Sequence, residues 1–242
     1  MFFLTLISCK KEKDDPIPYS ASFTATINNQ SVYLSESNGA IWSSGSGYSG
    51  LSTIPDSTNI QFRLFLGKLF KSDGDYKSSL AITFNNHINT NELVPPGPSG
   101  DISEVMFREL LNVGSYQYTY LSEASSGIII EWYDDSGKFW ASGRNQHQNN
   151  GIPLNPPDYN GSSFEVTYST PAEIDYPVHS WAQQLSIKFS CFVFNNLGDS
   201  IWIDNGILNC KYSYGMSFNI SLNSLHPKNQ VGQRIQSKLN IK

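Results

Sequence analysis

The sequence is poor in charged residues and has no excess of basic ones. Only 15% of its 242 residues are charged, and 16 basic residues stand against 21 acidic ones, which gives a net charge of −5. Nucleic-acid-binding proteins ordinarily present a basic surface to the phosphates, so this balance predicts no nucleic-acid partner. The chain also lacks a run of about 20 apolar residues, the length that a membrane-spanning helix needs.

Histidine and cysteine are scarce as well. The chain has four histidines and three cysteines, namely His87, His147, His179 and His226, and Cys9, Cys191 and Cys210. These residues do not have the short, paired spacings of a zinc site. The sequence therefore predicts no metal ion, no cofactor and no catalytic residue.

Aromatic residues, in contrast, are abundant and predict a folded domain. They make up 13% of the chain, which is enough to bury a core. Short segments in which apolar and polar residues alternate are typical of half-buried strands. The predicted strands are 22–27, 32–34, 60–66, 80–84, 116–121, 127–133, 138–141, 164–168, 185–194, 200–203 and 207–212. This pattern indicates an all-β fold, either an antiparallel β-sandwich or a partly open barrel.

Three segments depart from simple alternation. One short helix is expected near residues 102–111, because Asp101 and Glu104 have the spacing of a capping box and Gly114 is placed to end the helix. Residues 35–58 are rich in serine and glycine and predict a long loop or weak strands. The strand 185–194 has apolar residues on both faces, including Phe192, and is expected to be central and covered on both sides.

The register of one hairpin follows from the sequence. A three-residue loop at 135–137 that ends in glycine suits a turn whose last residue is left-handed. It places Asp134 opposite Lys138, Tyr133 opposite Phe139 and Trp132 opposite Trp140. One opposite-charge pair and two aromatic pairs favour this register, and the tryptophan pair is expected in the core.

The N-terminus resembles that of a bacterial lipoprotein. Residues 2–7 are apolar, Ser8 and Cys9 follow, and a charged run continues to Pro16. This segment resembles a lipobox, in which the cysteine is acylated and becomes the mature N-terminus. The resemblance implies a shortened signal at 1–8, an acylated Cys9 with a tether at 9–20, one domain at 21–213, and a further strand and polar tail at 214–242. A six-residue apolar stretch is short for a signal, so a start further upstream or a misassigned start stays open, as does a chance cysteine.

Several segments together resemble a group of uncharacterised Bacteroidetes lipoproteins. The matching segments are 23–28, the helix into 114–116, 127–140, 163–166 and 189–206. The resemblance implies a β-sandwich anchored in the outer membrane by its lipid, either displayed at the cell surface or facing the periplasm. Because that group has no assigned activity, it implies no catalytic residue.

Acylation of Cys9 would leave Cys191 and Cys210 as a pair. In an oxidising envelope compartment this pair can form a disulfide. The alternative is two buried free thiols, because cysteine is often a small core residue.

Two functions remain open for a lipid-anchored, non-catalytic protein. The first is binding of an extracellular ligand, with a glycan as the narrower hypothesis. Sugar rings stack on exposed aromatic side chains, and Trp42, Tyr48 and Trp181 lie in or beside expected loops, where binding residues are common. The second is a structural or accessory role in contact with another envelope protein.

A glycoside hydrolase is the least favoured hypothesis. It needs two carboxylates across a cleft, one of them with a raised pKa. The candidates are Glu131, Asp134, Asp135 and Glu165. Only an exposed acidic pair that faces a pocket would support this function.

Replacing Cys9 tests the lipid anchor. Each buried CH₂ of an acyl chain contributes about 0.8 kcal/mol to membrane binding, so Cys9→Ala is expected to move the protein from the membrane fraction to the soluble fraction of cells. A variant that stays with the membranes would contradict the lipoprotein prediction. Protease treatment of intact cells then checks surface display, because a protected protein would face the periplasm.

Overall fold

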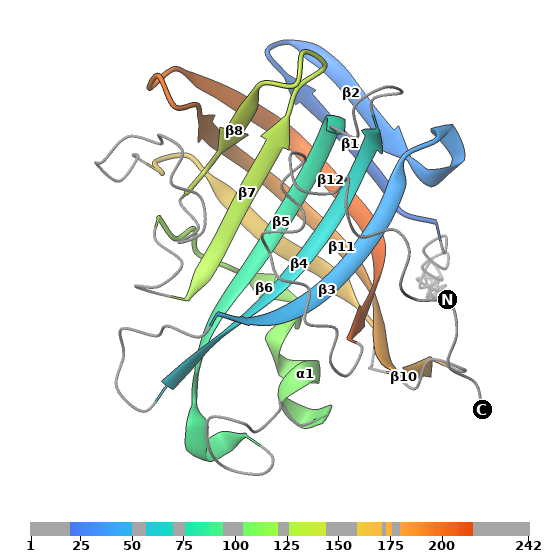
Figure 1. Cartoon of the computed structure of the whole chain (residues 1–242), viewed down its shortest axis with the longest axis vertical. Helices are drawn as coiled ribbons and strands as arrows, with labels where there is room; N and C mark the ends of the chain where they lie inside the picture. The colour runs from blue at the N-terminus through green and yellow to red at the C-terminus, as the bar shows by residue number, and fades with distance from the viewer. Residues whose placement is uncertain are drawn as a thin grey trace, which may run out of the picture.

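In the described part of the chain, twelve strands form one antiparallel sheet that curls into a nearly closed barrel (Figure 1). The computed structural model describes residues 20–49, 57–69, 76–93, 104–120, 126–143, 159–170, 173–175 and 180–214. This architecture confirms the predicted all-β, partly open barrel. The signal, Cys9, nearly all of the tether and the tail beyond residue 214 lie outside the described ranges and stay predictions.

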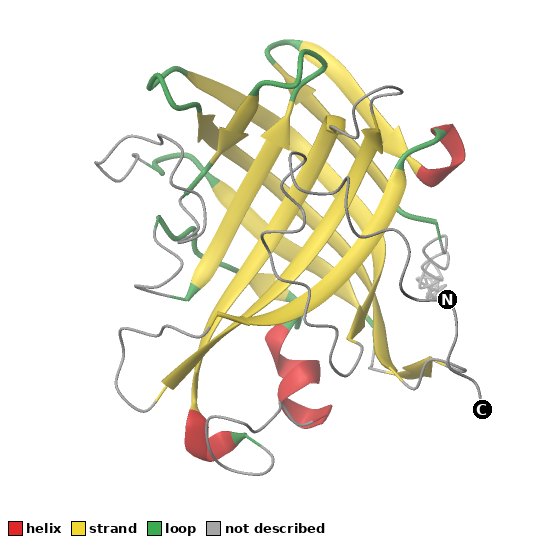
Figure 2. Cartoon of the chain, viewed as in Figure 1, coloured by secondary structure: helices red, strands yellow, loops and turns green. Residues whose placement is uncertain are grey.

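The strand order follows the hydrogen-bonded neighbours around the sheet. It runs β2 (Gln30–Ser35), β1 (Ser22–Ile27), β12 (Ser200–Tyr214), β11 (Ser180–Phe194), β8 (Phe139–Ala141), β7 (Gly127–Tyr133), β5 (Tyr76–Asn89), β4 (Ser57–Leu69) and β3 (Ile41–Ser49). Off this path, β9 (Ser163–Ser169) and β10 (Glu173–Asp175) pair with β11, and β6 (Gly114–Ser115) pairs with β9. The helices are α1 (Glu104–Leu110) and the 3-10 turns η1 (Glu36–Asn38) and η2 (Thr90–Glu92) (Figure 2). The helix expected near 102–111 is therefore present, although Asp101 lies outside the described residues.

Side chains join β3 to β12 and bring the sheet close to closure. The Trp42 indole Nε1 donates to the Lys211 carbonyl at 3.1 Å. Two residues along each strand, the Ser213 amide donates to Ser44 Oγ at 3.1 Å. These bonds use side chains of β3, and the described strand order does not pair β3 with β12, so the barrel has one open seam.

The interior of the barrel is filled by aromatic and aliphatic side chains that alternate along each strand. Phe23 stacks on Phe189 with ring centroids 5.9 Å apart, and Phe62 meets Tyr212 edge to face at 5.6 Å. Residues from strands far apart in the sequence therefore touch across the interior. These ring contacts make the barrel a packed core.

The β7–β8 hairpin has the predicted register. Trp132 pairs with Trp140, Tyr133 pairs with Phe139, and the Asp134 amide donates to the Lys138 carbonyl at 3.0 Å. Gly137 is left-handed, with φ 80°. Both tryptophans are buried, at 3% and 6% exposure, so their predicted place in the core is confirmed.

β12 corrects the prediction of two separate strands at 200–203 and 207–212. It is one continuous strand with a bulge, because Phe189 pairs with Gly206 and Cys191 pairs with Ile203. Ser190 therefore faces two residues of β12, Asp204 and Asn205, and Asn205 takes the left-handed conformation with φ 51°. The gap between the two predicted strands is therefore the bulge at Asp204 and Asn205, and Gly206 follows it in the regular ladder.

Of the two alternatives for Cys191 and Cys210, the structure has two buried free thiols and no disulfide between them. Cys210 pairs with Leu185 on β11, six residues from Cys191, so the two cysteines are about 20 Å apart along the strand. A disulfide needs Cα atoms within about 7 Å. Burial raises the pKa of the Cys191 thiol to about 12.

Two further expectations concern aromatic residues. The serine- and glycine-rich region 35–58 contains β3 and the start of β4, which is the strand alternative and not the long loop, so Trp42 and Tyr48 lie in a strand. Trp181 lies within β11. That strand is central, but its outward face is not fully covered, because Phe192 is 36% exposed.

Substitution of Gly206 tests how the bulge fits the core. A Cβ at this position would lie 2.8 Å from the Phe189 ring, so Gly206→Ala is expected to cost about 1–3 kcal/mol of unfolding free energy, as overpacking does. Urea unfolding measures the change. In a Phe189→Leu background the ring is gone and the added cost of Gly206→Ala should shrink; the same cost in both backgrounds would contradict this packing.

Candidate binding groove

Of the three aromatic residues predicted to bind a ligand, only Trp42 has a described side chain. Trp42 is half-buried, packs against the core and donates its indole N–H to Lys211. It therefore helps to close the barrel, and its role as a stacking residue stays a prediction that these contacts do not favour. The side chains of Tyr48 and Trp181 lie outside the described residues, so their roles stay predictions.

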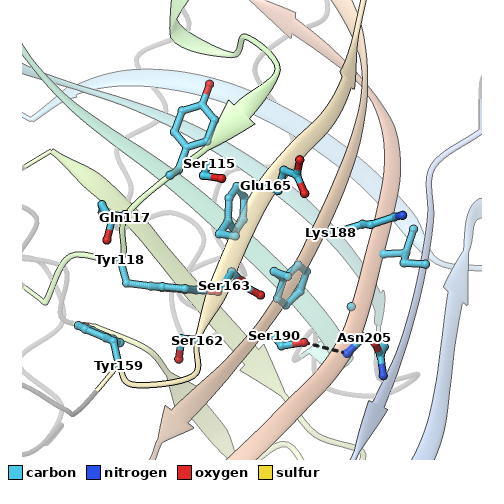
Figure 3. Close-up of a pocket in the computed structure, with 15 residues that line it drawn as sticks. Ser115, Gln117, Tyr118, Tyr159, Ser162, Ser163, Glu165, Lys188, Ser190 and Asn205 are labelled. Carbon is cyan, nitrogen blue, oxygen red and sulfur yellow. Dashed lines mark hydrogen bonds between the residues drawn. The ribbon is translucent and has the colours of Figure 1, made fainter.

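A different hollow, here called the polar groove, lies on the outward face of β9, β11 and β12 beside β6 (Figure 3). Its volume is about 560 Å³. Cross-strand pairing sets Ser115, Glu165, Lys188 and Ile207 side by side in one row. A second row contains Ser163 and Ser190, which are paired, and Asn205 of the bulge. The groove thus collects polar side chains from four strands.

The bulge fixes the second row of the groove. Ser190 Oγ accepts a hydrogen bond from the backbone N–H of Asn205 at 3.1 Å, drawn in Figure 3, and donates to Asp204 Oδ1 at 3.3 Å. The side-chain amide of Asn205 donates to Asp204 Oδ2 at 2.7 Å. This network holds the extra residue of β12 toward the groove. An Asn-Gly pair inside an apolar strand is a known sign of a bulge, and it is the one sequence signal that could have located this row.

Two tyrosines form one end of the groove. Tyr118 and Tyr159 stack with ring centroids 5.4 Å apart and an interplanar angle of 18°. Tyr118 donates its hydroxyl to the Ser163 carbonyl at 3.1 Å, and Tyr159 donates to the Ser142 carbonyl at 2.6 Å. Burial raises the pKa of both phenols above the ordinary value of 10. Both therefore stay neutral, with hydroxyls committed to the backbone and rings that form a fixed wall.

Three side chains of the groove are available to a ligand. Gln117, Glu165 and Lys188 are exposed, and within the described ranges no hydrogen bond or ion pair engages their side chains. Glu165 and Lys188 stand directly opposite each other on β9 and β11. The groove therefore offers a carboxylate that accepts, an ammonium that donates and an amide that does both.

The carboxylates expected of a hydrolase do not meet in this groove. Among the described residues that line it, Glu165 is the only acid. Glu131 is buried on the outward face of β7 and forms an ion pair with Arg63, with 2.5 Å between Glu131 Oε2 and Arg63 Nη2. A buried carboxylate needs such a partner to remain charged, so Glu131 is a structural residue.

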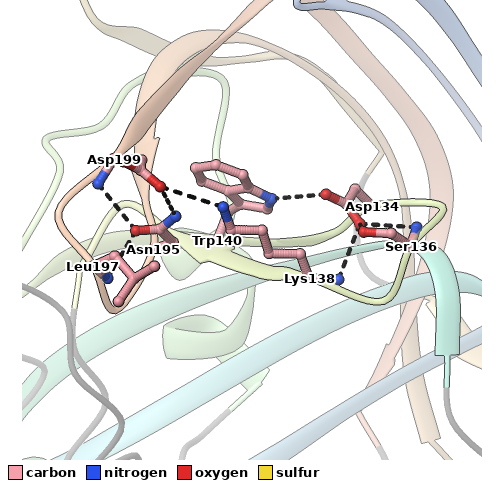
Figure 4. Close-up of polar contacts among 7 residues, drawn as sticks. All are labelled: Asp134, Ser136, Lys138, Trp140, Asn195, Leu197 and Asp199. Carbon is pink, nitrogen blue, oxygen red and sulfur yellow. Dashed lines mark hydrogen bonds and ion pairs between the residues drawn. The ribbon is translucent and has the colours of Figure 1, made fainter.

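Asp134 and Asp135 face a second hollow, of about 500 Å³, between the β1–β2 and β7–β8 hairpins. Asp134 Oδ1 accepts from the amides of Ser136 and Lys138, both at 2.9 Å, and Oδ2 accepts from the Trp140 indole at 3.2 Å (Figure 4). Partial burial acts to raise the pKa of Asp134, but hydrogen bonds from Ser136, Trp140 and Lys138 lower it below 3.8 overall. A glycosidase acid needs the opposite shift.

The β7–β8 turn is also tied to the neighbouring β11–β12 turn. Lys138 Nζ lies 3.3 Å from Asp199 Oδ2 and 4.4 Å from the centre of the Trp140 ring. Asp199 in turn accepts from the Asn195 side chain at 2.7 Å (Figure 4). The contacts of Asp134 and Lys138 are thus explained by the joining of two hairpins at one end of the barrel.

Comparisons with known proteins add no relative. No protein-family model matches the chain, and no curated protein or solved structure matches it significantly. The resemblance to Bacteroidetes lipoproteins therefore stays a prediction. Over the described ranges, no cluster of three or more His, Cys, Asp or Glu side chains could hold a metal ion, and no helix is long and apolar enough to span a membrane.

Acidification tests the structural role of Asp134. Its folded pKa lies below 3.8, whereas an unfolded aspartate has a pKa of about 3.9. The charged form therefore stabilises the fold above pH 4, and this contribution is lost as the pH falls through the folded pKa. We expect Asp134→Asn to lower the unfolding free energy by about 1 kcal/mol at pH 7 and by much less at pH 2–3.

Thermal unfolding of both proteins across this pH range measures the difference. Asp135→Asn is the matched control, since Asp135 is exposed and bonds only Ser78 among the described residues. A stability difference for Asp134→Asn that does not change with pH would contradict the role of its charge.

Proposed function

We propose that this chain is a lipid-anchored, non-catalytic envelope protein of the outer membrane, displayed at the cell surface, that binds an extracellular glycan in the polar groove. The observation that carries the proposal is the set of unengaged side chains of Gln117, Glu165 and Lys188. Exposed polar residues are common, but here cross-strand pairing and the bulge gather them in one hollow. The lipid anchor and the surface location rest on the lipobox resemblance.

The groove chemistry favours a sugar among polar ligands. Sugar hydroxyls both donate and accept, and the groove presents both kinds of partner in neighbouring positions. Its described lining holds one carboxylate, Glu165, and one ammonium, Lys188, so its net charge is zero and a neutral ligand is favoured over a polyanion. The Tyr118–Tyr159 pair supplies an apolar wall beside these groups.

The packing of the barrel places the ligand on its outside. The interior is filled by rings such as Phe23, Phe164 and Phe189, and Phe189 stacks on both of the others. Opening space for a sugar there would break contacts that stabilise the core. The outward face of β9, β11 and β12 binds a ligand without disturbing that core.

The accessory role in contact with another envelope protein is the second candidate. The observation in its favour is the position of β2 at one end of the strand order, with one edge unpaired among the described strands. Tyr33 on this strand is 53% exposed. An unpaired edge can add a strand from a partner protein.

A glycan-array screen of the full chain carrying Cys9→Ala tests the groove. We expect binding to neutral glycans, and we expect Glu165→Gln with Lys188→Gln to weaken it about tenfold or more, because both charged hydrogen-bonding groups are lost. The matched control is Glu109→Gln with Lys77→Gln, which changes the same residue types at exposed positions outside the groove and should bind normally.

Two results would overturn the proposal. One is no binding to any glycan by a folded protein. The other is binding that the groove variant and the control variant affect equally. In either case, crosslinking in intact cells would test the accessory role next.

A further inference from the structure

The polar groove continues into an exposed aromatic pair along the same two strands. The outward-facing positions of β11 are Lys188, Ser190 and Phe192 in order. Those of β12 are Ile207, then Asn205 and Asp204 of the bulge, and then Trp202. Phe192 and Trp202 are cross-strand partners, with ring centroids 4.5 Å apart. The outward face therefore has a charged row, a polar row and then a row of rings.

The ring row is open to solvent. Phe192 is 36% exposed and Trp202 is partly exposed. Phe189 and Tyr212 of the same strands are buried in the barrel at 2% and 0% exposure, whereas Phe194, the next outward position of β11, is partly exposed. The two rings are tilted by 57° to each other, so each offers its own apolar face beside hydrogen-bonding groups, the combination that sugar rings match.

The length of this face sets the size of the ligand. Lys188 and Phe192 are four residues apart on β11, which corresponds to about 13 Å along an extended strand. One sugar ring does not reach from the charged row to the ring row. A ligand that uses both must have at least two linked units.

We infer that the ligand is a neutral oligosaccharide whose chain lies along β11 and β12, with the hydroxyls of one unit on Glu165 and Lys188 and the apolar face of another on Phe192 and Trp202. This inference rests on the proposed glycan-binding function and adds the chain length, the direction and a second subsite. The bulge lies between the two subsites, where Ser190 holds Asn205 toward the ligand.

Titration calorimetry with a chain-length series tests this inference. The probes are glucose-, xylose- and mannose-based oligosaccharides of one, two, four and six units. For the series that binds, we expect the longer members to bind about tenfold more tightly than the monosaccharide, because only they reach the rings. Trp202→Ala should remove most of this gain, so that the longer members bind about as weakly as the monosaccharide does.

The variants separate the two subsites. Glu165→Gln with Lys188→Gln should weaken binding at every chain length. Trp202→Leu and Phe192→Leu should weaken mainly the longer probes. These leucine variants keep apolar packing and replace Trp202→Ala if that variant does not fold. Tyr33→Ala removes an exposed ring on β2 and is the matched control.

The outcomes separate a failure of the second subsite from a failure of glycan binding itself. Binding that does not depend on chain length, or that survives loss of both rings, would overturn the second subsite while leaving glycan binding in the groove intact. A folded protein that binds none of these probes and no glycan on the array would overturn both.

Discussion

The extra residue in β12 is the feature on which both the core and the groove depend. On the inner side of the strand, Gly206 leaves room for the Phe189 ring, which stacks on Phe23 and Phe164. On the outer side, Asn205 turns toward the groove and is held by Ser190. A regular strand would put a side chain where the Phe189 ring lies and would shift every outward residue beyond it to the opposite face.

Features that depend on residues close together in the sequence could be predicted, and features that depend on contacts between distant segments could not. The β7–β8 register followed from the sequence because Asp134, Lys138 and the two tryptophans are close neighbours along the chain. The role of Trp42 could not follow, since its hydrogen-bond partner Lys211 is 169 residues away. A serine- and glycine-rich surrounding indicates a loop locally, and only the β4 and β12 neighbours make that segment a strand.

The polar groove could not be predicted from the sequence either, because it too depends on contacts between distant segments. Gln117, Glu165 and Lys188 are ordinary exposed residues in three separate segments, and only the pairing of β6, β9 and β11 brings them together. The sequence offers Glu165 as a candidate for a catalytic acid pair, but its neighbours across the strands are Lys188 and Ser115. A carboxylate beside an ammonium suits recognition of hydroxyls, which both donate and accept. Asp134 and Glu131 have structural roles instead, because Asp134 accepts hydrogen bonds within its hairpin and Glu131 forms an ion pair.

The most direct test of glycan binding on this face is an NMR titration of the Cys9→Ala protein with an oligosaccharide of six units, followed through backbone amide and tryptophan indole signals. The account predicts that shift changes gather on Gln117, Glu165, Lys188, Ser190, Asn205 and the Trp202 indole, along one face of β9, β11 and β12. Changes confined to β2, to the β3–β12 seam at Trp42 or to the hollow at Asp134 would place the ligand elsewhere and contradict it.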